Sequence, residues 1–298
     1  MAQGSQGSII QASMAALAFP RRQVRDLMGL PKTLAMVGSL EARLATTKAE
    51  IRRAQKLRYK VFFEEGDATP DATASLIRRD VCRFDRVCDH LIIVDTAVRR
   101  DDGRPTAVGA YRLLRGDIAA ANFGFYSAGE FDIASLIARH PGKRLLELGR
   151  SCVAPNYRGK RALELLWRGI WAYARHHRID VMFGCASFPG ADPQQHAEAL
   201  RFLRGTSGPD ALWDVEAIAG RAVATELAPT GPADPRAALR ALPPLIKSYW
   251  RLGAKFGPQA VGDADFGATD IFAVMPVAEI GARYLQHFGA DEAPSMAA

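Results

Sequence analysis

Residues 145–163 constrain the fold of this chain more than any other segment, because an apolar strand here runs into a basic turn that opens an amphipathic helix. The expected helix repeats apolar residues at the spacing of one buried face: Leu163, Leu166, Trp167, Ile170, Trp171 and Ala174. An alternating run at 179–186 predicts the next strand. A strand–turn–helix–strand unit of this kind predicts a sheet with a helix packed on it.

The turn itself is suited to binding phosphate. Backbone N–H groups at the start of a helix have no intrahelical partner, and the helix dipole is positive there, so the position favours an anion. Arg158, Lys160 and Arg161 add positive charge beside Gly159. The segment therefore predicts a phosphate-binding loop at the end of a strand.

Residues 153–160, Val-Ala-Pro-Asn-Tyr-Arg-Gly-Lys, resemble the acyl-donor loop of the GNAT N-acyltransferase superfamily. The resemblance implies backbone amides that hold the phosphate of a pantetheine thioester. The residues expected to bind phosphopantetheine are Ser151, Cys152, Val153, Arg158, Gly159, Lys160, Arg161 and Ala162. It also implies a GNAT-type α/β fold, with a mixed, mostly antiparallel twisted sheet flanked by helices.

Arg161 stands where most members that use acetyl-CoA carry a second glycine. Its side chain would crowd the pyrophosphate of CoA, whereas the prosthetic group of acyl carrier protein presents a single phosphate. We therefore predict acyl carrier protein as the donor. A surface arginine beside an ordinary CoA site is the alternative.

Composition limits the possible partners. The chain has 298 residues, 48% of them hydrophobic, and a formal net charge of +7. This charge suits an acidic protein partner, an anionic membrane surface or nucleic acid. The basic residues are scattered and not interleaved with aromatic residues, which argues against nucleic acid. The four cysteines lack the paired spacing of a zinc site, so we expect reduced, buried thiols and no metal.

The ends of the chain differ from its centre. We expect residues 1–39 to form a mobile or amphipathic tail, and residues 40–298 to form one domain. Within that domain, residues 40–190 form the GNAT-like core and residues 191–298 a helical extension with a late strand at 269–277. No apolar run reaches the roughly 20 residues that cross a bilayer. We therefore predict a cytoplasmic protein that can be peripheral on the inner membrane face.

Local signals place further elements in the core. Thr47 and Glu50 form a capping-box pattern for a helix that runs to about Glu64, after a first strand at 39–45. Strands at 90–95 and 106–114 flank a turn and predict a hairpin. Helices are expected at 128–140, 192–204 and 243–256. Arg58 on the helix and Arg112 in the hairpin fall among apolar neighbours, so each requires a partner or a route to water.

The strand that begins at Leu145 contains a conflict. Glu147 and Arg150 differ in parity, so a regular strand would point them to opposite faces. A β-bulge at Gly149 would bring both to one side and bend this central strand away from its neighbour. Such a bend predicts a splayed wedge in which a pantetheine arm pairs with the backbone of residues 151–153.

A more specific resemblance covers roughly residues 40–190. The residues Arg58, Phe62, Asp85, Arg112, Glu147 and Arg150 resemble the charged pattern of acyl-homoserine-lactone synthases. Residues 80–90, followed by Leu-Ile-Ile-Val, look like the L-ornithine N-alpha-acyltransferases. Residues 125–132, 165–170, 243–247 and 265–270 extend that likeness. It implies transfer of a 3-hydroxyacyl group from acyl carrier protein to the α-amine of L-ornithine, giving lyso-ornithine lipid, with no permanently bound cofactor.

The charged residues suit this chemistry. Arg58, Arg112 and Arg150 can hold a carboxylate, since a guanidinium binds it in a bidentate way. Phe62 belongs to the same expected acceptor site. Glu147 is the predicted base and Asp85 the residue that orients the cationic end of the acceptor, with the reverse assignment left open. Tyr173 is a candidate to protonate the leaving thiolate.

Three alternatives stay open. The arginines and carboxylates can form an internal network that only rigidifies the core. The acceptor can be another small amine, as in a lactone synthase. The chain can also be a non-catalytic protein that binds acyl carrier or membrane.

Overall fold

The computed structural model describes residues 27–206, 210–223, 234–281 and 284. The amphipathic segment expected within residues 1–26 lies outside these ranges, as does most of the loop expected at 225–235. None of the helices in the described ranges is both long and apolar enough to span a bilayer.

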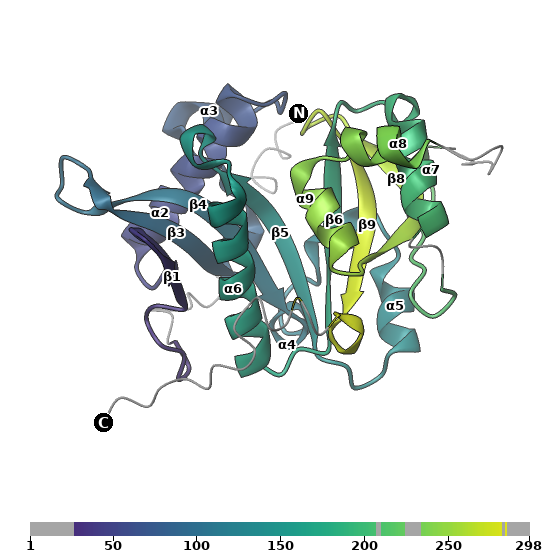
Figure 1. The fold of residues 1–298 in the computed structure, drawn as a ribbon, viewed down its shortest axis with the longest axis horizontal. Helices are drawn as coiled ribbons and strands as arrows, with labels where there is room; N and C mark the ends of the chain where they lie inside the picture. Colours follow the sequence, from purple (N-terminus) through teal and green to yellow (C-terminus); the bar gives the residue numbers. More distant parts are fainter. Residues whose placement is uncertain (1–26, 207–209, 224–233, 282–283, 285–298) are drawn as a thin grey trace, which may run out of the picture.

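One sheet contains all the strands of the described residues (Figure 1). Its spatial order is β1 (Ala35–Val37), β2 (Leu40–Leu44), β3 (Asp89–Arg99), β4 (Pro105–Arg115), β5 (Leu145–Val153), β6 (Val181–Pro189), β9 (Ala268–Pro276), β8 (Lys255–Asp263) and β7 (Ala222–Val223). Neighbours are antiparallel except β5 and β6, which are parallel. The predicted mixed, mostly antiparallel sheet is confirmed.

Helices cover both faces of the sheet (Figure 1). Leu91 and Ile93 of β3 pack in one core, to which four helices contribute: α6 (Lys160–His176), α7 (Ala197–Thr206), α8 (Pro235–Ala241) and α9 (Pro244–Arg251). Their neighbours Ile92 and Val94 point to the other face, where α2 (Lys48–Tyr59) packs. On that face α4 (Gly116–Ala120) and α5 (Ile133–Arg139) cover the far half of the sheet. This alternation is the period of two that strand geometry requires.

Helix α2 follows the sequence signal closely. The hydroxyl of Thr47 accepts a hydrogen bond from the Glu50 amide, and the Glu50 carboxylate accepts one from the Thr47 amide, both at 3.2 Å. The π-helical turn η1 (Lys60–Glu64) extends the helix to the predicted end. Both the capping box and the hairpin of β3 with β4 are therefore confirmed.

Several element boundaries differ from prediction. The pairing of β1 with β2 through a turn at Gly38, whose φ is +61°, places a strand within the segment expected to be a tail. Helix α5 begins only at Ile133, because Asp132 accepts a hydrogen bond from the Ser135 amide and caps it there. The expected helix at 243–256 ends at Arg251, and β8 takes over the last residues. The division into tail, core and extension stays a prediction.

Short helical segments complete the chain. They are α3 (Ala72–Ile77), η2 (Arg83–Arg86), η3 (Tyr126–Gly129), η4 (Pro155–Tyr157), η5 (Pro193–His196) and η6 (Val277–Glu279). Segment η3 lies beside the middle of β5, because the amides of Tyr126 and Ser127 donate hydrogen bonds to Glu147 on that strand.

Strands β5 and β6 separate as predicted. They pair only where Leu145–Glu147 meets Val181–Phe183. Beyond that point each strand keeps only the partner on its other edge, which is β9 for β6 and β4 for β5. The two ribbons run apart between α6 and α9 in Figure 1. One edge of β5 therefore has no strand partner over residues 148–153 in the described sheet.

The bulge in β5 lies one residue later than predicted. Arg112 pairs with Gly149 and Ala110 with Cys152, so Tyr111 alone faces two residues, Arg150 and Ser151. Arg150, not Gly149, has the left-handed φ of +53°. This conformation is costly for a residue with a side chain, so the surrounding contacts must hold it.

Gly184 marks the point at which the two strands part. A Cβ atom there would clash with the carbonyl oxygen of Leu148 on β5. We expect Gly184→Ala to lower the free energy of unfolding by about 1–3 kcal/mol, because the strands must move to admit the methyl group. Urea unfolding measures this change. Gly205→Ala on α7, where the added carbon meets open space, is the control, and equal stability of the two variants would contradict the close approach.

Candidate active site

Two adjoining pockets occupy the region where β5 and β6 separate. The large pocket has a volume of about 710 Å³, and the small pocket about 240 Å³. Both are lined by Phe62, Ser151, Ser187, Leu245, Phe266 and Ala268. Pockets for drug-sized ligands are usually about 300–1,000 Å³. The large pocket thus suits an extended ligand and the small one a compact molecule.

The large pocket brings together most of the residues predicted to bind phosphopantetheine. Its lining includes Ser151, Cys152, Val153, Arg158, Gly159 and Lys160. Ala162 is not part of the lining, because its side chain is only 2% exposed and packs in the core beneath α6. Arg161 is exposed and also lies outside the lining. Apolar residues from α6 and the start of α9, among them Leu163, Leu166 and Leu245, contribute to the rest of the lining.

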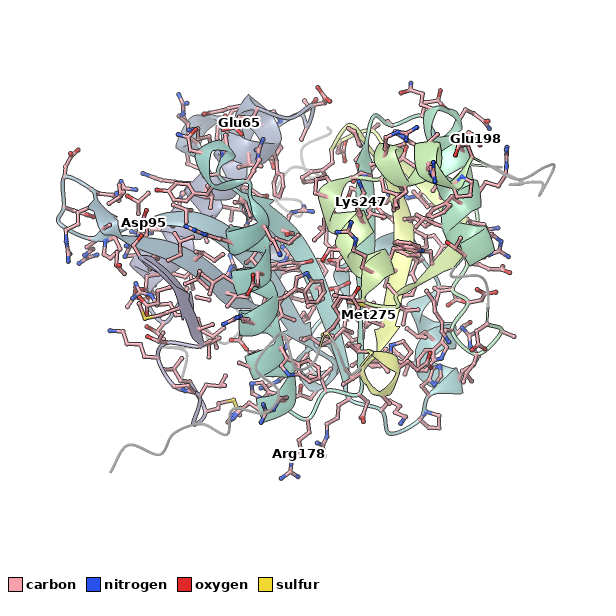
Figure 2. The ribbon with its side chains drawn as sticks, in the orientation of Figure 1. Glu65, Asp95, Arg178, Glu198, Lys247 and Met275 are labelled. Carbon is pink, nitrogen blue, oxygen red and sulfur yellow. The ribbon has the colours of Figure 1, made fainter. Side chains whose placement is uncertain are left out.

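The polar end of the large pocket is the start of α6. The first amides of a helix have no intrahelical acceptor. In α6 they also lack a capping side chain, because the N-cap residue is Gly159. The Arg158 guanidinium donates to Glu65 Oε2 at 2.8 Å and to the Val153 carbonyl at 3.1 Å. Figure 2 labels Glu65 at this end of the molecule, and Arg178, just past the end of α6, at the other. The arrangement offers amides and positive charge to a phosphate.

Arg150 and Phe62 are the predicted acceptor-binding residues that line the small pocket. The Arg150 guanidinium lies over the rings of Phe266 and Tyr126, at 4.0 and 4.7 Å from their centroids. Its Nη1 donates to the Tyr126 hydroxyl at 3.1 Å. Stacking on two rings fixes the guanidinium plane. These contacts hold the strained Arg150 backbone and leave the cation at the pocket wall.

Arg58, Arg112 and Asp85 form a buried network that lines neither pocket. Arg58 Nε lies 2.7 Å from Asp80 Oδ2, and its Nη2 lies 2.8 Å from Asp85 Oδ2. Arg112 Nη1 is 3.6 Å from Asp85 Oδ1. These cations hold the pKa of Asp85 well below its usual range, although burial alone would raise it. The geometry argues against both predicted roles of Asp85 and favours the internal network.

Glu147, the predicted base, lies at the wall of the small pocket. Its carboxylate accepts hydrogen bonds from the Ser127 amide at 2.7 Å, the Ser127 hydroxyl at 2.6 Å and the Tyr126 amide at 2.9 Å. Burial raises the pKa of Glu147 above 4.5 in spite of these bonds. A fixed carboxyl group with a raised pKa is suited to accept a proton from an amine. Glu147 and Arg150 therefore face the same pocket.

Comparison with known proteins decides the family. An acetyltransferase (GNAT) domain model matches residues 57–168. An L-ornithine N(alpha)-acyltransferase of Agrobacterium fabrum is 51% identical over 86% of this chain and 87% of its own length. The enzyme of the same name from Rhizobium meliloti is 47% identical over 94% of this chain and 95% of its own. The chain belongs to the L-ornithine N(alpha)-acyltransferase family. It is an acyltransferase with a GNAT-type fold.

A solved structure is also similar to this member of the family. FeeM, an N-acyl amino acid synthase from uncultured soil microbes, is 12% identical, with a TM-score of 0.47 over 82% of this chain and 95% of that one.

The position of Tyr173 does not fit its predicted role as the group that protonates the leaving thiolate. It is fully buried, its hydroxyl donates to Asp89 Oδ2 at 2.7 Å, and it lines neither pocket. Two other tyrosines, Tyr111 and Tyr249, line the small pocket, and their hydroxyl groups are hydrogen-bonded to each other. Burial raises the pKa of Tyr111 to about 12, so it keeps its proton at neutral pH.

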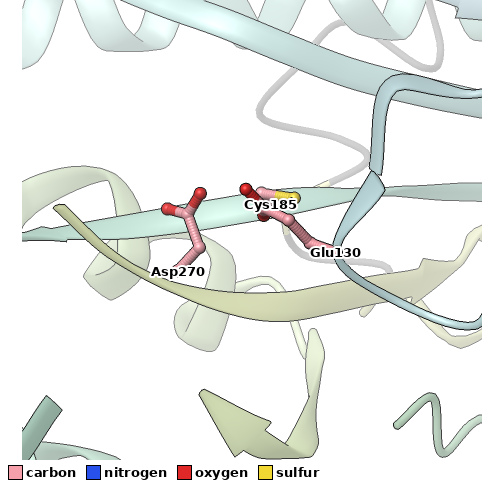
Figure 3. Close-up of side chains that lie close together, drawn as sticks. All are labelled: Glu130, Cys185 and Asp270. Atoms are coloured by element: carbon pink, nitrogen blue, oxygen red, sulfur yellow. Dashed lines mark hydrogen bonds between the residues drawn. The ribbon is translucent and has the colours of Figure 1, made fainter. Parts of the chain in front are cut away.

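One wall of the small pocket is acidic, and none of its residues was predicted from the sequence as a site residue. Cys185, Asp263 and Asp270 line it. Figure 3 shows Glu130 beside Cys185 and Asp270, brought together from separate segments. The resemblance already included Glu130 and Asp270 within the matched segments 125–132 and 265–270. No local pattern signals that these residues meet.

Proposed function

We propose that this acyltransferase moves a 3-hydroxyacyl group from the phosphopantetheine thioester of acyl carrier protein to the α-amine of L-ornithine, giving lyso-ornithine lipid. The observation that carries the proposal is the pair of adjoining pockets, one ending at the amides of α6 and the other holding Glu147 and Arg150. The names of the related enzymes indicate L-ornithine as the acceptor.

The donor enters the large pocket. Its phosphate lies at the start of α6, and its pantetheine arm runs along the unpaired edge of β5 toward Ser151. The acyl chain occupies the apolar part of the pocket that α6 and α9 line. An acidic carrier protein suits a chain that carries +7 overall, because opposite charges attract the two partners. The same charge supports contact with an anionic membrane surface.

The acceptor enters the small pocket. Arg150 binds its carboxylate, because a guanidinium fixed on two rings presents parallel donors. Glu147 takes a proton from the α-ammonium, and the free amine attacks the thioester carbonyl carbon. An N–H group of the β5 backbone near Ser151–Val153 stabilises the oxyanion.

The intermediate then collapses with cleavage of the C–S bond. The leaving thiolate takes up the proton that the new amide nitrogen gives up, and the hydroxyl pair of Tyr111 and Tyr249 on the pocket wall can relay it. The scheme requires acid–base groups and a thioester only. Arg58, Arg112 and Asp85 act as positioning residues, linked to Arg150 because Arg150 Nε lies 3.4 Å from Asp80 Oδ2.

Thiol release measures the proposed reaction directly. The purified protein is incubated with 3-hydroxyacyl carrier protein and single amino acids. Release that depends on L-ornithine supports the proposal. Thiol release with a different amine would show that the protein is an N-acyltransferase with another acceptor. Carrier binding without turnover would show that it is a non-catalytic binding protein.

The basic loop gives a prediction about the donor. We expect combined replacement of Arg158 and Arg161 by glutamine to weaken carrier binding about tenfold at low salt, because two surface charges leave the phosphate end. Wild-type binding should fall steeply as salt rises, and the variant should respond less. Equal activity with CoA thioesters and with the carrier would contradict the choice of donor. Lys143→Gln, an exposed charge away from this loop, is the control.

A further inference from the structure

One wall of the small pocket is acidic, and the steps of the proposed reaction do not involve its carboxylates. We call Glu130, Asp263 and Asp270 the acidic cluster: Asp263 and Asp270 line the pocket, and Glu130 lies next to Asp270 outside the lining. These three residues are 4%, 8% and 5% exposed, respectively. Glu130 follows η3, Asp263 ends β8 and Asp270 lies in β9, so three separate segments converge here. Figure 3 shows Glu130 and Asp270. One ligand atom each of Glu130, Cys185 and Asp270 lies within 4.8 Å of the others.

Within the described residues, the cluster has less positive charge beside it than buried carboxylates normally require. The Oδ1 atom of Asp270 is buried and has no hydrogen-bond partner among the residues that the structure describes. In the described part of the chain, neither Asp263 nor Asp270 forms an ion pair within 4.0 Å, and Glu130 has only the half-exposed Arg221 at 3.7 Å. A buried carboxylate without compensating charge is expensive, so an unpaired oxygen on an aspartate that lines a pocket indicates a missing cationic ligand.

The electrostatics of the cluster agree with this geometry. Burial, followed by the negative charge of Asp270, raises the pKa of Glu130 to about 7. Burial also raises the pKa of Asp270, outweighing hydrogen bonds from Ser187 and Glu130, and the charge of Asp263 adds to the rise. Arg150 counteracts this only in part. A bound cation would relieve the repulsion and favour the ionised carboxylates.

We propose that the acidic cluster binds the side-chain ammonium of the acceptor and so selects an amino acid with a cationic side chain. This inference rests on the proposed function, in which Arg150 and Glu147 of the same pocket take the carboxylate and the α-amine. It gives the cluster the role that sequence analysis gave to Asp85. The small pocket then has one site for each charged group of a dibasic amino acid.

A metal ion fits the cluster less well than an ammonium group. The Cys185 thiol donates to Glu130 Oε2 at 3.3 Å. Burial, with Asp270 and Glu130 nearby, raises the pKa of Cys185 well above 9.0, so the thiol is protonated and a poor ligand. An ammonium group instead supplies donors to the carboxylate oxygens, including Asp270 Oδ1.

Acceptor competition tests the inference. Wild type, Asp270→Asn and Glu130→Gln each receive 3-hydroxyacyl carrier protein with equimolar L-ornithine and L-norvaline, which is the same chain without the side-chain amine. We expect wild type to prefer ornithine strongly, and each variant to lose at least about tenfold of that preference, mainly through a higher KM for ornithine. Asp265→Asn, an exposed carboxylate in the neighbouring loop, should retain the wild-type preference.

The outcomes separate this inference from the proposed function. If wild type uses ornithine and both variants keep its preference, the inference alone fails. If wild type acylates an uncharged amino acid and not ornithine, both fail. Thermal stability with L-ornithine, with MgCl₂ and with ZnCl₂ is measured on the same proteins. Stabilisation of wild type by a metal alone, lost in Asp270→Asn, would make the cluster a metal site and overturn the inference.

Discussion

Replacing Glu147 by glutamine should lower kcat by about 10²–10⁴-fold and leave carrier binding nearly unchanged, because a general base contributes at this scale to the chemical step. Glu147 lines the small pocket and not the large one. Steady-state kinetics with 3-hydroxyacyl carrier protein and ornithine gives the rate, and a binding titration gives the carrier affinity.

The pH profile adds a second measure of Glu147. Because burial raises the pKa of this carboxyl above 4.5, kcat/KM should rise with pH along a limb that lies above that value, as the base ionises. The limb should disappear in Glu147→Gln. Ser127→Ala, which removes one hydrogen bond but keeps the carboxylate, should retain it. An unchanged rate in Glu147→Gln would remove Glu147 from the role of base.

Replacing Arg58 by methionine should lower the free energy of unfolding by about 3–5 kcal/mol, because two buried carboxylates lose their shared cation. Arg58 is 1% exposed and contacts both Asp80 and Asp85. The lowered pKa of Asp85 stabilises the folded protein above the usual pKa of 3.8, and this contribution is lost as the pH falls below it. Urea unfolding at several pH values measures both effects.

Arg52→Met provides a matched control for Arg58. Arg52 lies on the same helix but is exposed, so its replacement should change stability by less than about 0.5 kcal/mol. Equal stability of the two variants, together with a large rise in the KM for ornithine in Arg58→Met alone, would restore Arg58 as a direct ligand of the acceptor and contradict the internal network.

The sequence predicted the elements whose signals are local. The capping box of α2 depends on Thr47 and Glu50, and the buried face of α6 on a repeat within one helix. Strand β8 carried no such signal, because Gly257 and Pro258 interrupt it and a register shift between Phe256 and Ala260 breaks its pairing with β9. Tertiary pairing decided this strand, as is common for β-structure.

The site was predictable in the same uneven way. The phosphate loop and Glu147 lie on one continuous segment, so a single pattern located both. The bulge was predicted, but its position was not, because Arg150 takes a left-handed conformation that only stacking on Tyr126 and Phe266 explains. The acidic cluster combines residues more than 100 positions apart, and no spacing rule reaches that far.

The structure of the amide product tests the central claim most directly. Wild-type protein, 3-hydroxyacyl carrier protein and L-ornithine labelled with ¹⁵N at the α-position are incubated together, and tandem mass spectrometry locates the acyl group. If the large pocket holds the thioester beside Glu147 of the small pocket, and the acidic cluster binds the side-chain ammonium, the acyl group will be on the labelled nitrogen alone. An acyl group on the side-chain nitrogen, or no amide at all, would contradict the account.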